Sequence, residues 1–208
     1  MNTIYSLSAQ HQQNVAEQDY ELIVIENRSA QCLNKQALLS IGNNIRYICR
    51  DEIGVSPAAA INEGFRLAQA PFIGLMIDGA RMATPRVIEY ALAARQFSNH
   101  SLTAIPSFNL GNSLQHLNLE TGHNETTEQE WLEHCQWKHN GYRLFDFSCI
   151  GEANPRGVFQ SFMESNCYFT SRENFSAIGY ADEAFHYPGG GGLNLHMFRS
   201  IGMLPACQ

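Results

Sequence analysis

Along the first half of the chain, the spacing of apolar and polar residues predicts strands and helices in turn. Short apolar runs bounded by polar residues predict strands at 20–25, 45–49 and 72–77. Before, between and after these runs, apolar residues recur at helical spacing and predict helices at 3–17, 31–41, 56–69 and 84–97. Because the connections are short, this alternation favours an α/β fold with a mainly parallel sheet flanked by helices.

The pattern changes after residue 98. It then predicts, in order, a strand at 102–108, a helix opened by a capping box at 127–130, a strand at 159–170 and a short helix at 173–178. A last helix is expected after the glycines at 189–192. The segments between these elements are irregular, so we expect one domain with two halves, residues 1–98 and 99–208.

Two of the predicted strands end in a carboxylate. The run at 72–77 is nearly unbroken, as expected of a strand buried on both faces, and it stops at Asp78. The run at 20–25 stops at Glu26 and Asn27. In open α/β sheets, ligands bind beyond the carboxyl ends of the strands, so a carboxylate there is well placed to meet a ligand or a metal. For Asp78 the alternative is that it only begins a turn.

Composition and charge narrow the classes of function. The chain has 208 residues, 44% of them hydrophobic, which is enough for a substantial core. Its net charge of -7 argues against nucleic acid as a partner, since no excess of Lys and Arg is present to neutralise phosphates. No apolar run reaches the roughly 18 residues of a transmembrane span, and the first residues do not resemble a secretion signal. We therefore expect a cytoplasmic protein, with peripheral contact to a membrane left open.

The cysteines are scattered and contain no Cys-x-x-Cys pair, which predicts reduced, mostly buried thiols and argues against a zinc site. There are six: Cys32, Cys49, Cys135, Cys149, Cys167 and Cys207. His134, Cys135 and His139 have the residue types of a metal site, but their neighbours are typical of the polar end of a surface helix.

Four stretches, in this order, resemble glycosyltransferase family 2, an inverting family with the GT-A fold. Its second strand and acidic turn are similar to YELIVIENRS, and its A-x-N-x-G helix with the following D-x-D strand is similar to SPAAAINEGFRLAQAPFIGLMIDGA. Its acceptor-side segment, which ends in a G-F-D-E-like turn, is similar to NCYFTSRENFSAIGYADEAF. The place of its G-G-E-D-x-D-L-x-x-R segment, which carries the usual catalytic base, is taken by PGGGGLNLHMFRS.

This resemblance implies a GT-A type, Rossmann-like sheet with an irregular acceptor-side C-terminal half. The first half would bind a nucleotide diphosphate sugar, and the second would face a glycan, lipid or protein acceptor. The implied activity is transfer of the sugar, with inversion. The implied donor-side residues are Glu26, Asn27, Asn62, Asp78, Gly79 and Arg81, and the acceptor-side residues are Asn166, Gly190, Gly191 and Asn194.

The chain departs from the family at both acidic motifs. Ala80 replaces the second acid of D-x-D, which leaves Asp78 as the metal ligand and puts a requirement for Mn or Mg in doubt. Gly191 and Gly192 replace the Glu-Asp pair at the position of the usual base. The family's first strand has no counterpart by this alignment, because residues 1–17 correspond to its first helix.

Three carboxylates remain as candidates for the catalytic base that deprotonates the acceptor: Glu164, Asp182 and Glu183. Glu183 is also expected to orient a loop. His186 and His196 lie beside the glycine run and are alternatives as base or metal ligand, although a lone histidine is more often structural.

On the donor side, Arg81 is the expected phosphate ligand, because its planar guanidinium forms paired hydrogen bonds with phosphate. The alternative is a solvated turn residue. Glu26 is expected to accept hydrogen bonds from the nucleotide base or ribose, and Asn62 to stabilise a loop. The glycine run precedes a predicted helix and would offer backbone N–H groups to an anion or a sugar hydroxyl, or serve as a hinge.

A different class of function stays open. The loss of acids at two motifs favours a catalytically degenerate GT-A domain that binds a nucleotide sugar or a partner without transfer. A nucleotidyltransferase on a related fold is disfavoured, because no Gly-rich phosphate loop follows the first strand.

Overall fold

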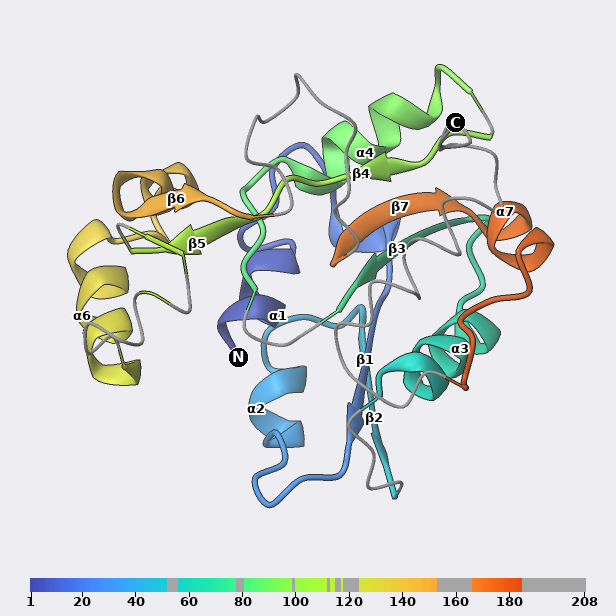
Figure 1. Ribbon diagram of the computed structural model, residues 1–208, viewed down its shortest axis with the longest axis horizontal. Coiled ribbons are helices and arrows are strands. Elements are labelled where there is room, and N and C mark those ends of the chain that lie inside the picture. Colours follow the sequence, from blue (N-terminus) through green and yellow to red (C-terminus); the bar gives the residue numbers. More distant parts are fainter. Residues whose placement is uncertain are drawn as a thin grey trace.

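A computed structural model describes the chain at residues 1–51, 56–77, 81–98, 100–111, 113–114, 117, 124–152 and 166–184. Within these residues the protein is a mixed α/β structure with three small sheets (Figure 1). The α/β class is therefore confirmed. The expectation of a mainly parallel sheet is wrong for the described strands, because one pair is parallel and the other pairings are antiparallel. No helix in the described part is long and apolar enough to cross a bilayer.

The parallel sheet consists of β1 (Leu22–Asn27) and β2 (Ile45–Arg50), with α2 (Lys35–Leu39) between them in the chain. Every residue of β1 has a partner in β2, from Leu22 opposite Ile45 to Asn27 opposite Arg50. The two strands therefore end side by side, at the edge where an α/β sheet presents its ligands.

Helices from the N-terminal part of the chain cover one face of this sheet. Ile4 of α1 (Asn2–Leu7) and Leu38 of α2 are buried together with Ile45 of β2. The side chain of Asn34 caps the start of α2 by accepting a hydrogen bond from a backbone N–H of its first turn. On the other face of the sheet, Ile25 lies against α3 (Ala58–Leu67).

The helix predicted at 3–17 is wrong beyond residue 7. Its apolar residues are too widely spaced to form one continuous face, and the hydroxyls of Ser6 and Ser8 donate to carbonyls three residues earlier, at 2.6 and 2.8 Å. Serine side chains that bond locally in this way compete with helix continuation. A short 3-10 helix, η1 (Glu17–Asp19), precedes β1.

In the second sheet, β7 (Cys167–Ser171) lies between β3 (Phe72–Met76) and β4 (Thr103–Ala104) and is antiparallel to both. β3 and β4 therefore run in the same direction, on either side of the inserted β7. The connection between them contains α4 (Val87–Arg95). An apolar run carries no information about strand direction or neighbours, so the sequence pattern did not predict the insertion.

β3 is not buried on both faces, as its apolar run suggested. Ile73 is buried, whereas Gly74 is exposed, and β3 lies at the end of its sheet in the described part. The helices predicted at 56–69 and 84–97 form as α3 and α4 with slightly shorter limits.

A further unit lies at the left in Figure 1. It contains α6 (Glu125–Cys135), the 3-10 helix η2 (Gly141–Phe147) and the antiparallel pair of β5 (Phe108–Leu110) and β6 (Ser148–Ile150). The single strand predicted at 102–108 is thus wrong, because that segment is divided between β4 and β5.

The start of α6 also differs from the prediction. Asn124 is the N-cap, and its Oδ1 accepts hydrogen bonds from Thr126 N at 3.0 Å and Thr127 N at 3.1 Å, so no capping box opens the helix at Thr127. The helix ends at Cys135, and the residue that caps its C-terminus, Gln136, has a left-handed φ of 50°. Of the strand predicted at 159–170, only the part from 166 lies in the described residues, and the last predicted helix lies outside them.

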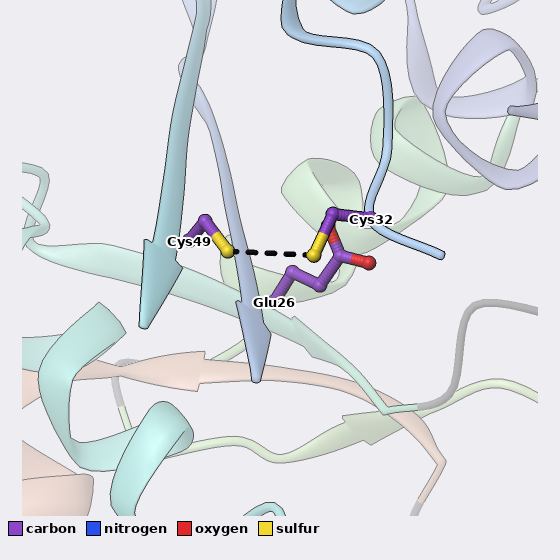
Figure 2. A group of neighbouring side chains, drawn as sticks. All are labelled: Glu26, Cys32 and Cys49. Carbon is purple, nitrogen blue, oxygen red and sulfur yellow. Dashed lines mark hydrogen bonds between the residues drawn. The ribbon is translucent and has the colours of Figure 1, made fainter. Parts of the chain in front are cut away.

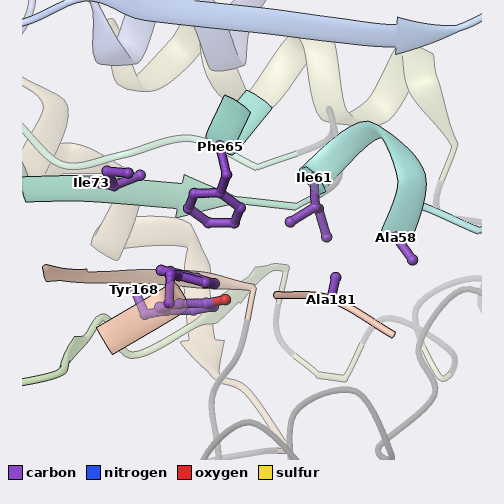
Figure 3. Packing of buried hydrophobic residues seen from close by; sticks show 7 residues of the cluster. Ala58, Ile61, Phe65, Ile73, Tyr168 and Ala181 are labelled. Atoms are coloured by element: carbon purple, nitrogen blue, oxygen red, sulfur yellow. The ribbon is translucent and has the colours of Figure 1, made fainter. Parts of the chain in front are cut away.

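The largest core cluster joins α3 to β3, β7 and the short helix α7 (Arg172–Ala177) (Figure 3). Phe65 of α3 and Phe175 of α7 are both buried, with ring centroids 3.8 Å apart. Burying a phenylalanine side chain contributes about 1.5–3 kcal/mol, so these two rings are a substantial part of the core. The buried residues of the cluster are Ala58, Ile61, Phe65, Ile73, Tyr168, Phe175 and Ala181.

A second packed region surrounds His11. Its ring lies 5.8 Å from that of Tyr5 and 5.3 Å from that of Trp137, and His11 is buried. Burial lowers the pKa of His11 below its ordinary value of 6.5, an effect that a backbone hydrogen bond with Ala83 partly opposes. Gly141 packs directly against this imidazole: a Cβ at Gly141 would lie 2.6 Å from His11 Nε2.

We expect Gly141→Ala to destabilise the protein by about 1–3 kcal/mol, because the added methyl group overpacks a buried region. A Cβ there would also lie 2.8 Å from Pro85 Cδ, so neither neighbour leaves room. Chemical denaturation measures the loss. Gly64→Ala is the control: its Cβ would meet only Ile25 Cδ1, at 3.4 Å, and alanine favours a helix interior, so stability should stay equal or rise. Equal stability of the two variants would contradict the packing at Gly141.

We expect the free energy of unfolding to fall as the pH drops below about 6.5. The unfolded chain binds a proton at His11 near that pH, whereas the folded protein, with its lowered pKa, does so only at lower pH. Urea denaturation at several pH values measures this slope. His11→Gln should flatten the slope, and His139→Gln, at an exposed histidine, should leave it unchanged. An unchanged slope in His11→Gln would contradict this assignment.

Candidate functional site at the carboxyl ends of the parallel strands

Glu26 and Cys49 lie opposite each other at the carboxyl ends of β1 and β2. Because side chains alternate between the faces of a sheet, Tyr47 lies on the same face as Cys49. This is the face that α1 and α2 cover nearer the start of the strands. The carboxylate, thiol and phenol therefore form a polar end to an otherwise apolar layer.

The Glu26 carboxylate is held in place by two hydrogen bonds. Its Oε2 accepts from Tyr47 Oη at 2.5 Å and from Leu33 N at 3.0 Å. Leu33 precedes α2, so Glu26 ties the β1–α2 loop to the sheet. The hydrogen bond to the carboxylate, together with burial, raises the pKa of Tyr47 above its usual range and keeps the phenol protonated. Glu26 was predicted to accept hydrogen bonds from a nucleotide, and Oε1 is the oxygen that the described residues leave for that role.

The same loop brings Cys32 next to Cys49, with 3.7 Å between the two sulfurs (Figure 2). Both cysteines are exposed and free, and desolvation, followed by the hydrogen bond with the Cys32 thiol, raises the pKa of Cys49. The prediction of mostly buried thiols is therefore wrong. Of the five described cysteines, only Cys135 and Cys167 are buried.

Asn27 and Arg81, two of the predicted donor-side residues, have different surroundings. Asn27 Nδ2 donates to the Ser56 carbonyl at 3.3 Å, which links the end of β1 to the segment before α3. Arg81 follows β3, and its buried Nε has no hydrogen-bond acceptor among the described residues. Its guanidinium thus keeps a donor for an anion. Asp78 and Gly79, the other two predictions at this strand end, lie outside the described residues.

Asn62 connects α3 to a distant segment of the chain. Its Nδ2 donates to the Ala181 carbonyl at 2.9 Å and to Glu183 Oε1 at 2.7 Å, and its Oδ1 accepts from Ala181 N at 2.9 Å. The Asn62 side chain is buried, so these bonds satisfy an amide that would otherwise be costly to bury. Asn62 stabilises a loop, namely residues 181–183, and Glu183 belongs to the same hydrogen-bond group.

The remaining predicted residues divide between described and undescribed parts of the chain. Asp182 is exposed, and its Oδ1 accepts from Ala184 N at 2.9 Å. The Asn166 carbonyl accepts from Ile77 N at 2.7 Å and so extends the pairing of β7 with β3. Cys135 is the last residue of α6; it is buried in a hydrophobic cluster with Leu132 and Trp137, and its thiol donates to the Leu132 carbonyl at 3.5 Å. Glu164, His186, Gly190, Gly191, Asn194 and His196 lie outside the described residues.

Sequence reasoning missed Tyr47, Cys32 and Cys49 as site residues. Tyr47 and Cys49 are two residues apart in a predicted strand, which places them on one face. The pairing of Cys49 with Glu26, however, depends on the register of β1 against β2, and the position of Cys32 depends on a loop. Neither feature has a signal in the sequence.

We expect Asn62→Ala to lower the free energy of unfolding by about 2–3 kcal/mol, because it leaves the N–H and C=O of Ala181 without their buried partner. Denaturant titration followed by circular dichroism measures the loss. Gln129→Ala removes an exposed amide whose 2.7 Å bond to Glu133 is on the surface of α6, and it should change stability by less than about 0.5 kcal/mol. A loss in Asn62→Ala no larger than that of the control would contradict the structural role of Asn62.

Comparison of the chain with protein-family models and with curated proteins finds no match. The resemblance to glycosyltransferase family 2 therefore depends on the four stretches of sequence quoted above, and the activity that it implies is a proposal.

Proposed function

We propose that this protein is a GT-A type glycosyltransferase that transfers a sugar, with inversion, from a nucleotide diphosphate sugar to a glycan, lipid or protein acceptor. The observation that supports this most is the contact of Asn62 with Ala181 and Glu183. Asn62 belongs to the stretch that resembles the donor-side helix, and Glu183 to the stretch that resembles the acceptor-side turn. A transferase must bring its two substrates together, and these two stretches meet although Asn62 and Ala181 are 119 positions apart in the sequence.

On the donor side, the nucleotide binds at the carboxyl ends of β1 and β2. Glu26 Oε1 accepts hydrogen bonds from the base or ribose, while Tyr47 and the Leu33 N–H hold the carboxylate in position through Oε2. Arg81 binds the diphosphate, because its buried Nε has no acceptor among the described residues. The net charge of -7 makes such a local cation necessary for binding an anionic donor.

The transfer itself is a single displacement. The acceptor hydroxyl oxygen bonds to the anomeric carbon as the bond from that carbon to the diphosphate oxygen breaks, and the nucleoside diphosphate leaves with the electron pair. A carboxylate takes the proton of the hydroxyl. Within the described residues, Asp182 and Glu183 are the candidates for this base, and both are exposed. Glu183 commits Oε1 to Asn62, so only its other oxygen remains for the proton.

A divalent cation fits this chain less well than it fits the family pattern. Mn or Mg would supply charge to the leaving diphosphate, and hard cations of this kind need oxygen ligands. Asp78 offers one carboxylate, whereas Ala80 offers none. Arg81 therefore offsets the charge on the diphosphate, and Asp78 remains as a single protein ligand for a metal.

We expect calorimetric titration with uridine, guanosine and thymidine diphosphate sugars, with and without Mn, to find one donor that binds. Asp78→Ala should weaken that binding by about tenfold or more, since one carboxylate ligand is lost. Asp146→Ala is the matched control, because Asp146 lies in η2, where it pairs with Arg143 at 3.3 Å. Binding of no donor would contradict the proposal.

Release of nucleoside diphosphate, measured on the donor identified in this way, separates a transferase from a binding module. We expect slow release by hydrolysis without acceptor. Glu183→Gln keeps an oxygen for Asn62 but loses the base, so it should bind the donor normally and lose turnover if Glu183 is the base; Asp182→Asn makes the same test of Asp182. Donor binding without any turnover would favour the catalytically degenerate domain.

A further inference from the structure

We propose that Glu26, Cys32 and Cys49 form a binding site for a Zn²⁺ ion, a site that goes beyond the proposed sugar transfer. One ligand atom from each of the three residues lies within 4.8 Å of the other two. Figure 2 shows the three side chains together, Glu26 and Cys49 from the paired strands and Cys32 from the loop after β1. Within the described residues, this is the one group of three or more such side chains with this spacing.

The distance between the two sulfurs matches that in a zinc site. Two sulfurs bound to Zn²⁺ at about 2.3 Å in tetrahedral geometry lie about 3.8 Å apart. Cys32 Sγ and Cys49 Sγ are 3.7 Å apart. A metal can therefore bind both sulfurs with little movement of either strand or loop.

The ligand types select zinc over the cations that a glycosyltransferase would use. Two thiolates and one carboxylate suit a borderline-soft ion such as Zn²⁺, whereas Mg and Mn prefer oxygen ligands throughout. The three ligands would carry three negative charges when deprotonated, and a divalent ion offsets most of that charge. Without a metal, three such groups this close together would repel one another in their ionised forms.

The surroundings already hold the ligands in place. Tyr47 and the Leu33 N–H bind Oε2 of Glu26, which is the kind of outer partner that orients a metal-bound carboxylate. The loop that carries Cys32 is closed by the same Leu33 bond, and Ser29 Oγ donates to the Gln31 carbonyl at 3.0 Å. Two of the ligands are on strands in register, so their separation is set by the sheet.

Three protein ligands leave the fourth tetrahedral position open. Cys32 and Cys49 are exposed, so water or a ligand from solution can reach the ion. Zinc sites with three protein ligands and one open position are those that bind substrates or activate water, whereas structural sites use four protein ligands. The inferred site therefore binds an exchangeable fourth ligand.

The test is a titration of the reduced, full-length chain with Co²⁺, whose bonds to thiolates give a charge-transfer absorption, followed by displacement with Zn²⁺. We expect one equivalent of metal. Cys32→Ser and Cys49→Ser should each weaken binding by more than about 100-fold, and Glu26→Gln by about tenfold or more. Cys149→Ser, at a half-buried cysteine on β6, is the matched control and should bind as the unaltered chain does.

Circular dichroism of each variant checks folding, and an unchanged spectrum is expected because Cys32 and Cys49 are exposed. Zn²⁺ should also raise the unfolding temperature of the unaltered chain but not that of the double variant Cys32→Ser/Cys49→Ser. Metal binding that persists in the double variant, or a reduced chain with free thiols that gives no thiolate absorption, would overturn the proposal. No nucleotide is present, so these results do not depend on whether the chain transfers a sugar.

Discussion

The hydrogen bonds of the buried Asn62 amide are the constraint on which the arrangement of the described chain depends. An amide in the interior must find a donor and an acceptor, and Asn62 finds both on the backbone of Ala181. The apolar residues of the cluster alone would allow other packings of similar free energy, since hydrophobic contacts have little directionality. The paired bonds fix the loop 181–183 to one position on α3. They thereby also position the end of the segment that runs from β7 through α7 to this loop.

The other polar group that organises the protein is Glu26. Its carboxylate closes the β1–α2 loop, binds a phenol and faces two thiols, all at the end of a parallel pair of strands. This position serves two proposals, a nucleotide on the donor side and a zinc ion. Both the nucleotide and the zinc ion would bind Oε1 of Glu26, because Tyr47 and Leu33 bind Oε2. The nucleotide therefore either binds to the zinc ion at its open fourth position or competes with it for Glu26. The same carboxylate thus links the metal chemistry of the site to its donor chemistry.

The sequence predicted what depends on local pattern and missed what depends on pairing. The predicted limits of β2 and α7 were close to those of the structure, and Glu26 became a candidate site residue because an apolar run ended there. The position of β7 between β3 and β4 was not predicted, because 90 residues of chain separate β7 from β3 and an apolar run does not specify which strand lies beside it. In the same way, Cys32 and Cys49 meet through strand register and a loop, although their 17-residue separation resembles no metal motif. The predicted length of the first helix was wrong for a local reason, namely that the hydroxyls of Ser6 and Ser8 donate hydrogen bonds to carbonyls of the same helix.

The two sides of the main core, α3 and the segment with α7, are far apart in the sequence, and this distance affects folding during synthesis. α3 leaves the ribosome with Ile61 and Phe65 on its apolar face, but Phe175 and Ala181 are synthesised more than 100 residues later. Until then α3 can pack against β1 and β3 but lacks its partners on α7 and the loop after it, and long-range contacts of this kind form slowly. This core cluster should therefore be completed late in synthesis, whereas the β1–β2 sheet, with its short connection, can form early.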